Sequence, residues 1–185
     1  MIQSALLKIA LGLFLALPGN IDPGPPHSFN SGDPAWESYC QMKQQWVTTL
    51  YRLVVSTRPD LKPVADATRE WRNAEIDFDT RRFKYIFKNH PHLIVRDQGL
   101  PAFVDLEWFP EFSETLRKQD PSFAKLEQRV LRLKKASQSS DRWPELKAYI
   151  DGLARREEYK TEFKKFYSDM AKVQRILNTT YVPDH

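Results

Sequence analysis

The chain has almost no cysteine: Cys40 is the only one among 185 residues. A single thiol excludes an internal disulfide, and it excludes zinc sites built from several thiolates. Cys40 falls on the apolar arc of a predicted helix, beside Trp36 and Val47, and no histidine is close to it in the sequence. Because a nucleophilic thiol needs a base nearby, we expect Cys40 to be a buried structural residue.

Glycine is also scarce, with 6 residues against 5 tryptophans, 11 phenylalanines and 7 tyrosines. This composition predicts few tight turns and an aromatic-rich interior. The sequence has no glycine-rich phosphate loop, no repeat of fixed period and no long alternation of apolar and polar residues, which is the pattern of a half-buried strand. It also lacks a C-x-x-C-H motif for haem attachment. We therefore predict an all-α protein without a cofactor.

Charge of one sign is not concentrated enough to suggest a nucleic-acid partner. The chain has 28 basic and 24 acidic residues, a net charge of +4, whereas a dedicated nucleic-acid binder is far more basic on one face. If the helices aligned the basic clusters on one face, weak association with a membrane surface would follow; otherwise they are solvated and balanced by nearby acids. The clusters are Arg81, Arg82, Lys84 and Lys88; Arg132, Lys134 and Lys135; and Arg155, Arg156, Lys160, Lys164 and Lys165.

The first residues resemble a secretory signal peptide, which we assign to residues 1–19. Lys8 precedes an apolar run over residues 9–17, too short to span a bilayer, and Pro18 and Gly19 end it. No clear small-x-small pair marks a cleavage site, so an uncleaved membrane anchor and a buried core helix stay open as alternatives. Residues 20–33 are rich in proline, glycine and serine and predict an extended tether.

Helical periodicity then continues through a predicted single bundle domain, residues 34–178, followed by a polar tail, residues 179–185. Asp33 and Asp120 each precede a proline, the pattern of a helix cap followed by the first helical residue, and Asp60 is a plausible cap for the next helix. We expect about three long and two or three short helices, with a possible short extended segment at residues 93–95. The predicted helices cover residues 34–56, 61–88, 100–118 with a break near Pro110, 121–136, 143–152 and 157–177.

The helix over residues 61–88 is the predicted centre of the fold, because its apolar arc covers more than half of its circumference. Four charged residues lie on one side within that arc: Arg72, Glu75, Asp79 and Arg82. Charges in such a place must be paired. Their spacing predicts an ion-pair ladder, Arg72–Glu75 and Asp79–Arg82. The alternative is a polar pocket in which Glu75 and Asp79 bind a cation or act as acid and base, with His90 nearby.

Histidine is rare, and His90 and His92 form the only closely spaced pair. Two imidazoles could share a metal if Asp97 or Asp105 completed the shell. A metal site is not favoured, because His90 also suits the C-terminal end of a helix, where positive charge is stabilised, and His92 suits a loop. Asn178-Thr179-Thr180 matches the glycosylation acceptor pattern, and the sequence leaves open whether Asn178 is modified.

The segment over residues 93–112 breaks the helical regularity and mixes aromatic with acidic residues, as contact surfaces do. Its candidate binding residues are Phe103, Trp108, Phe109 and Phe112, with core burial as the rival explanation. We favour a secreted or periplasmic helical protein that binds another protein or an envelope component without catalysis. The alternative function is a ligand or metal carrier, or an acid/base enzyme, using the pocket around Glu75, Asp79 and His90.

Overall fold

A computed structural model describes residues 31–95, 98–104 and 108–180, and within them every regular element is helical. The all-α prediction is therefore confirmed. The predicted signal peptide and most of the tether lie outside the described residues, as do residues 181–185 of the predicted tail. Among the helices described, none is long and apolar enough to cross a membrane.

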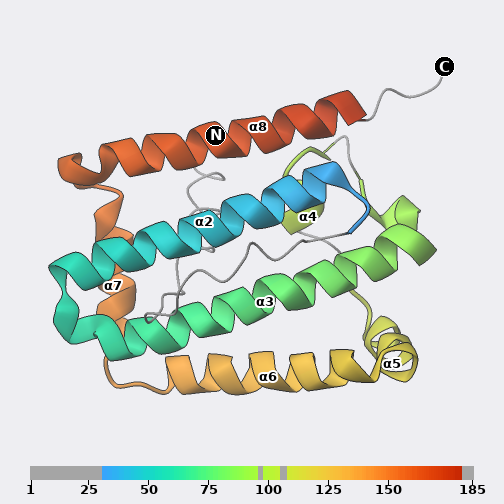
Figure 1. Cartoon of the computed structure of the whole chain (residues 1–185), viewed down its shortest axis with the longest axis horizontal. Coiled ribbons are helices and arrows are strands. Elements are labelled where there is room, and N and C mark those ends of the chain that lie inside the picture. The colour runs from blue at the N-terminus through green and yellow to red at the C-terminus, as the bar shows by residue number, and fades with distance from the viewer. Residues whose placement is uncertain (1–30, 96–97, 105–107, 181–185) are drawn as a thin grey trace.

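Four helices lie side by side in one antiparallel layer, in the order α8, α2, α3 and α6 (Figure 1). The short helix α7 crosses one end of this layer and carries the chain from α6 to α8. Helices α4 and α5 lie at the opposite end. The bounds are α2 Pro34–Thr57, α3 Lys62–Asn89, α4 Pro101–Val104, α5 Pro110–Gln119, α6 Pro121–Gln138, α7 Trp143–Leu153 and α8 Lys160–Thr180.

Two helices begin as the sequence predicts. The Asp33 carboxylate accepts hydrogen bonds from the backbone amides of Ala35 and Trp36, at 2.9 and 3.1 Å, and so caps α2. The Asp120 carboxylate accepts from the amide of Ser122 at 2.9 Å and caps α6. The predicted tether does contact the fold at its end, because Ser31 is buried and its amide donates to Glu37 at 3.0 Å.

The predicted cap of α3 is wrong. A 3₁₀ turn, Pro59–Leu61, leads directly into the helix, and no side chain caps it. The Asp60 carboxylate instead binds Arg58 and Arg142, because two guanidinium groups are within reach of it. The other end of α3 is as expected: His90 leaves the helical conformation just before Pro91.

Residues 93–95 do not form the extended segment considered from the sequence. Leu93 closes a second 3₁₀ turn, Pro91–Leu93, in which the Leu93 amide donates to the His90 carbonyl at 3.0 Å. A three-residue strand needs a partner to satisfy its backbone groups, and the described residues contain no strand to pair with it.

Helix α3 has its broad apolar arc because neighbours pack on two of its sides. On the α2 side, Phe83 stacks on Trp36 with ring centroids 4.1 Å apart. On the α6 side, Phe78 stacks on Phe123 at 5.2 Å, and Trp71 packs against Val130. Helix α2 packs α8 on its far side, where Trp46 stacks on Phe166 at 4.4 Å. Neighbours therefore cover two sides of α3, which accounts for the width of its apolar arc.

The segment before α4 is fastened to α8 at Gly99. This residue has φ +68°, a conformation that favours glycine, and an added Cβ would lie 2.4 Å from the side chain of Gln174. The Leu100 amide next to it donates to that side chain at 3.1 Å. Ordered by this contact, α4 places Phe103 against the end of α2.

Candidate functional site

The four charged residues on α3 come together with a fifth from α2, and we call the five the charged seam. Arg72 pairs with Glu75, and Arg82 pairs with Asp79 at 3.4 Å, as the sequence spacing predicts. The Lys43 ammonium of α2 lies 3.4 Å from the other Asp79 oxygen. The seam therefore joins α2 to α3 by an ion pair that the sequence analysis did not include.

Burial and neighbouring charges act in opposite directions on the pKa values of Asp79 and Lys43. Burial raises the pKa of the Asp79 carboxyl, and the opposing attraction of Lys43 and Arg82 does not reverse this. Burial alone would lower the pKa of the Lys43 ammonium, but the fields of Tyr39, Asp79 and Glu75 together hold it above its ordinary value. Lys43 is therefore a cation at neutral pH. Cations already occupy the space around both carboxylates, which opposes binding of a further metal ion there.

Cys40 lies beside the charged seam and is 1% exposed, as predicted. Its sulfur is 3.5 Å from the Thr80 hydroxyl. Burial raises the pKa of the thiol to about 12 despite this hydrogen bond. The thiol is therefore protonated at neutral pH and has no nucleophilic role.

The alternative pocket of Glu75, Asp79 and His90 is not assembled. Asp79 and His90 are eleven residues apart along α3, so about 16 Å separates them along the helix axis. His90 stacks on Phe112 instead, with ring centroids 4.5 Å apart. Among the histidines that the structure describes, none therefore lies next to the two carboxylates.

The histidine pair is likewise without further ligands in the described chain. The His90 and His92 ring centroids are 6.2 Å apart. No group of three or more histidine, cysteine or acidic side chains in the described residues is placed to hold a metal ion. Asp97 and Asp105, the predicted completing ligands, lie outside those residues.

The predicted binding surface divides into a buried and an accessible part. Phe103 is 4% exposed and lies in the core, where its ring meets those of Trp36 and Phe83 edge-on at 5.2 and 5.5 Å. Its assignment to a surface is wrong, because α4 turns it toward the α2–α3 interface. Trp108 and Phe109 are half-buried, and Phe112 is 9% exposed.

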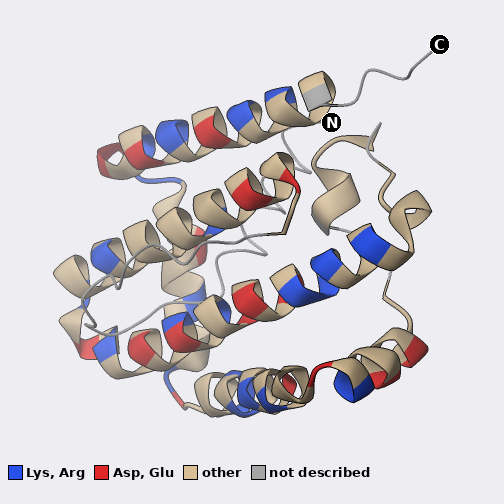
Figure 2. Ribbon diagram, turned by 45° about the vertical axis from the view of Figure 1, so that its right-hand side comes forward, with Lys and Arg blue, Asp and Glu red and all other residues tan. Residues whose placement is uncertain are grey.

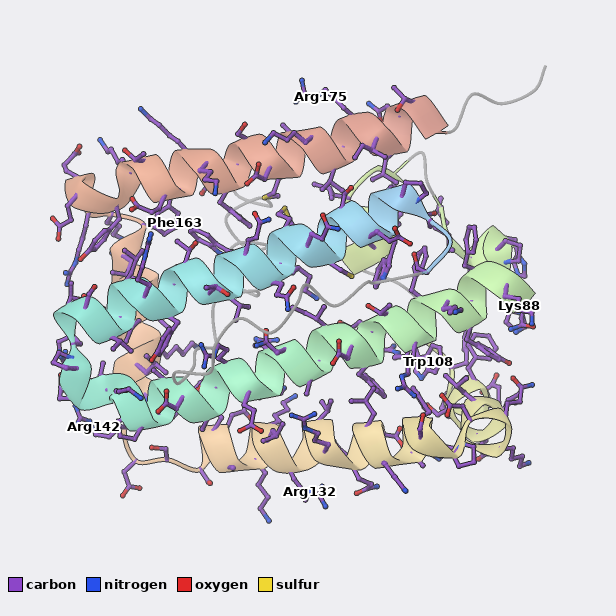
Figure 3. All side chains as sticks on the ribbon, viewed as in Figure 1. Lys88, Trp108, Arg132, Arg142, Phe163 and Arg175 are labelled. Atoms are coloured by element: carbon purple, nitrogen blue, oxygen red, sulfur yellow. The ribbon has the colours of Figure 1, made fainter. Side chains whose placement is uncertain are left out.

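Trp108, Phe109 and Phe112 join Tyr85 and His90 in an aromatic group at the end of α3, which we call the corner cluster. Phe112 is its centre, with Trp108, Phe109 and Tyr85 at ring-centroid distances of 5.6, 5.2 and 5.6 Å. The four residues around it are each partly open to solvent. Figure 3 shows Trp108 beside the end of α3 and near α5.

Trp108 is held in place by polar as well as apolar contacts. Its indole nitrogen donates to the Ser113 hydroxyl at 2.8 Å, and the Arg82 guanidinium lies 4.5 Å from its ring centroid. Arg82 thereby connects the corner cluster to the charged seam. A ring fixed on two sides with its remaining surface accessible is pre-organised for contact, since little side-chain entropy is lost on binding.

The basic clusters do not share one face. Arg132 lies on α6, and Lys160, Lys164 and Lys165 lie on α8, at the opposite edge of the layer (Figure 1). Arg81 and Arg82 are paired with Asp120 and Asp79. The alignment that a single cationic face of all the clusters would require is therefore not present, because α2 and α3 lie between the two outer helices.

A groove of about 190 Å³ lies between α2 and α8 and was not expected from the sequence. Met42, Trp46 and Phe166 form its apolar part, and none of the predicted site residues lines it. Asn178, the candidate glycosylation residue, is exposed on the last turn of α8, where its side chain accepts a hydrogen bond from Gln174 at 2.9 Å.

Comparison with known proteins adds no function to this geometry. No protein-family model, no curated protein and no solved structure matches the chain.

Proposed function

We propose that the chain is a non-catalytic binding protein that docks another protein, or an envelope component, through the corner cluster. The observation that carries the proposal is that Trp108 and Phe109 are only half-buried although they pack into an aromatic group. Tryptophan is enriched among the few residues that dominate binding energy at protein interfaces, and a side chain already held in place loses little entropy on binding. We further propose that the domain is a single helical bundle following an N-terminal signal segment, so that binding takes place outside the cytoplasm.

The charges of the two elements beside the cluster support a protein partner with a mixed surface. Lys84 and Lys88 are exposed near the end of α3, while Glu111 and Glu114 are exposed on α5. An apolar centre between cations on one side and carboxylates on the other matches the common interface arrangement of an apolar core within a polar rim. The rim charges then favour one orientation of the partner over others.

The contacts within the seam favour binding over catalysis. Cations hold both seam carboxylates, and among the described residues the histidine nearest to Asp79, His90, lies about 16 Å away along the helix. The Cys40 thiol lies beside Lys43 and Asp79, but burial keeps it protonated at neutral pH. These contacts favour the binding function over the acid/base alternative.

Photocrosslinking in the native host tests the docking surface. The full chain would carry a benzophenone amino acid at position 109, with position 167 as the control. Tyr167 is also an exposed aromatic residue, but it lies on α8, far from the cluster. We expect one discrete protein adduct from position 109 and none from position 167. The same adducts from both positions, or none from position 109, would contradict the proposal.

A further inference from the structure

The outward surface of α6 has more basic side chains than it has ion pairs. The helix has one acid, Glu127. Both of its carboxylate oxygens accept hydrogen bonds from the Arg117 guanidinium, at 2.7 and 2.9 Å. Every charged side chain that is exposed on this surface is cationic. We call this surface the α6 outer face: Lys125, Gln128, Arg129, Leu131, Arg132, Lys134 and Lys135.

Lys125, Arg132 and Lys135 have no ion-pair partner among the described residues. Arg129 pairs with Glu70 at 3.4 Å, but both side chains are more than half exposed, and Lys134 lies 5.6 Å from the Trp71 ring centroid. Arg132 comes seven residues after Lys125 and three before Lys135. This spacing puts the three side chains on one side of α6, which faces away from α3. Figure 2 shows the basic segments along α6 at the edge of the layer.

Leu131 makes this surface amphipathic. It is 55% exposed, the highest value among the large apolar side chains of the described residues, and it lies between the cations. Burying such a leucine is favourable only if the partner offers an apolar layer. A membrane interface offers one directly beneath a layer of phosphate groups, and lysine and arginine stems reach up to those phosphates while a leucine enters below.

We propose that the α6 outer face binds an anionic phospholipid surface. Each lysine or arginine close to such a surface contributes roughly fivefold to the partition constant. This interaction is separate from docking at the corner cluster, so either can fail without the other. Together they describe a protein held against a membrane by one edge of its helical layer while a partner binds at one end.

Co-sedimentation of the full chain with vesicles tests this directly. The vesicles would contain about 30% phosphatidylserine in phosphatidylcholine, with pure phosphatidylcholine as the reference for any contribution of the apolar residues 9–17. We expect the variant Arg132→Glu, Lys135→Glu to lower the partition constant at least about tenfold, and high salt to abolish most of the binding.

A matched variant on the opposite edge is the control. Lys164→Glu, Arg175→Glu changes the charge by the same amount at exposed positions of α8. Three interhelical spacings of about 9 Å separate the two edges, several times the Debye length of about 8 Å at physiological salt, so binding through α6 is unaffected by it. The proposal would be overturned if the α8 variant lost binding, or if the α6 variant bound as well as the native chain.

Leu131→Ser distinguishes a membrane from a soluble polyanion. We expect this variant to bind anionic vesicles several-fold more weakly while its retention on a heparin column is unchanged, because heparin has no apolar layer. Vesicle binding that does not exceed binding to phosphatidylcholine alone, together with strong heparin retention, would instead assign the face to an acidic macromolecule. Unchanged circular dichroism and melting temperature show that each variant is folded.

Discussion

At the scale of single residues, polar side chains inside or beside the α2–α3 interface connect the two helices. Cys40 and Thr80 meet there, and Lys43 reaches Asp79 across it. Each of these groups pairs with a neighbour from the other helix. Their pairing gives the interface a defined register, since a shift of either helix would separate them.

Cys40 provides the first prediction. Because burial raises the pKa of its thiol to about 12, the thiolate fraction at pH 8 is roughly a thousandfold below that of an ordinary thiol. We expect iodoacetamide to label the native protein at least that much more slowly than the chain unfolded in urea, as followed by mass spectrometry. Rapid labelling of the native protein would show that the thiol is accessible and reactive.

The second prediction concerns the Lys43–Asp79 pair. The side chains are 12% and 26% exposed, so Asp79→Leu leaves a mostly buried ammonium without its partner. We expect the free energy of unfolding to fall by about 2–3 kcal/mol, below the value for a fully buried pair because some water reaches Asp79. The double variant Lys43→Met, Asp79→Leu should recover more than half of this loss in urea denaturation.

An exposed pair provides the control for that cycle. Lys62 and Asp66 are four residues apart on α3, with an ion-pair distance of 2.8 Å and more than a third of each side chain exposed. The coupling energy of Lys62→Met with Asp66→Leu should be about 0.5 kcal/mol or less. Equal coupling in the two pairs would mean that the seam gains nothing from burial.

The sequence contains a signal for the Lys43 side of this pair. Lys43 lies at the centre of the apolar stripe of α2, three to four residues from Tyr39, Cys40, Trp46 and Val47. A lysine in such a position must find an anion on the facing helix. Periodicity identifies it as buried, but which acid it meets depends on the packing of α2 on α3, which local pattern does not determine.

At the scale of elements, helix starts were predictable where a single residue makes the cap. Asp33 and Asp120 cap α2 and α6 because the amides they bind are only two or three residues away. The same local argument fails for Asp60, because its carboxylate accepts a hydrogen bond from Arg142, 82 residues further along the chain. Long-range ion pairs of this kind are not visible in local sequence.

The third prediction follows from that ion cluster, which ties the start of α3 to α7. Hydrogen bonds from Arg58 and then Arg142 lower the pKa of Asp60, and those from Arg142 and then Arg58 lower that of Glu145. A carboxyl whose pKa is lower in the folded state stabilises the fold above its unfolded pKa near 4, and this contribution is lost as the pH falls below that value.

The variant Asp60→Asn, Glu145→Gln should therefore be less stable than the native chain at pH 7, and the difference should shrink as the pH falls from 5 to 2. Urea denaturation across that range measures it. Asp141→Asn, a change of the same kind at an exposed carboxylate nearby in sequence, should leave the curve unchanged. A constant difference across the range would show that the cluster stabilises the fold by packing and not by charge.

At the scale of the whole molecule, helix content and the central position of α3 were predictable, because both follow from periodicity and the width of an apolar arc. The layered order of α8, α2, α3 and α6 was not predictable, since an apolar stripe shows that a helix face is buried but not which helix covers it. That order puts the basic residues of α6 and those of α8 at opposite edges of the layer (Figure 1). Phe103 is buried for a separate reason, because α4 places it against Trp36 and Phe83.

The corner cluster also depends on how distant parts of the chain pack together. Trp108, Phe109 and Phe112 were identified from sequence as a group, but Tyr85 and His90 join them only because α5 folds back against the end of α3. Whether an aromatic residue in an irregular segment is buried or half-buried depends on what covers it. The distinction between Phe103 and Phe109 could therefore not be made from local pattern.

The measurement that tests the account most directly is the affinity of the full chain for the protein crosslinked at position 109, compared among three variants by titration calorimetry. We predict that Phe109→Ala and Trp108→Ala each weaken binding tenfold or more, since truncating an anchoring aromatic residue typically removes at least about 2 kcal/mol, and that Tyr167→Ala leaves the affinity within twofold. Equal affinities for folded variants at positions 108, 109 and 167 would show that the corner cluster is packing and that the binding surface lies elsewhere.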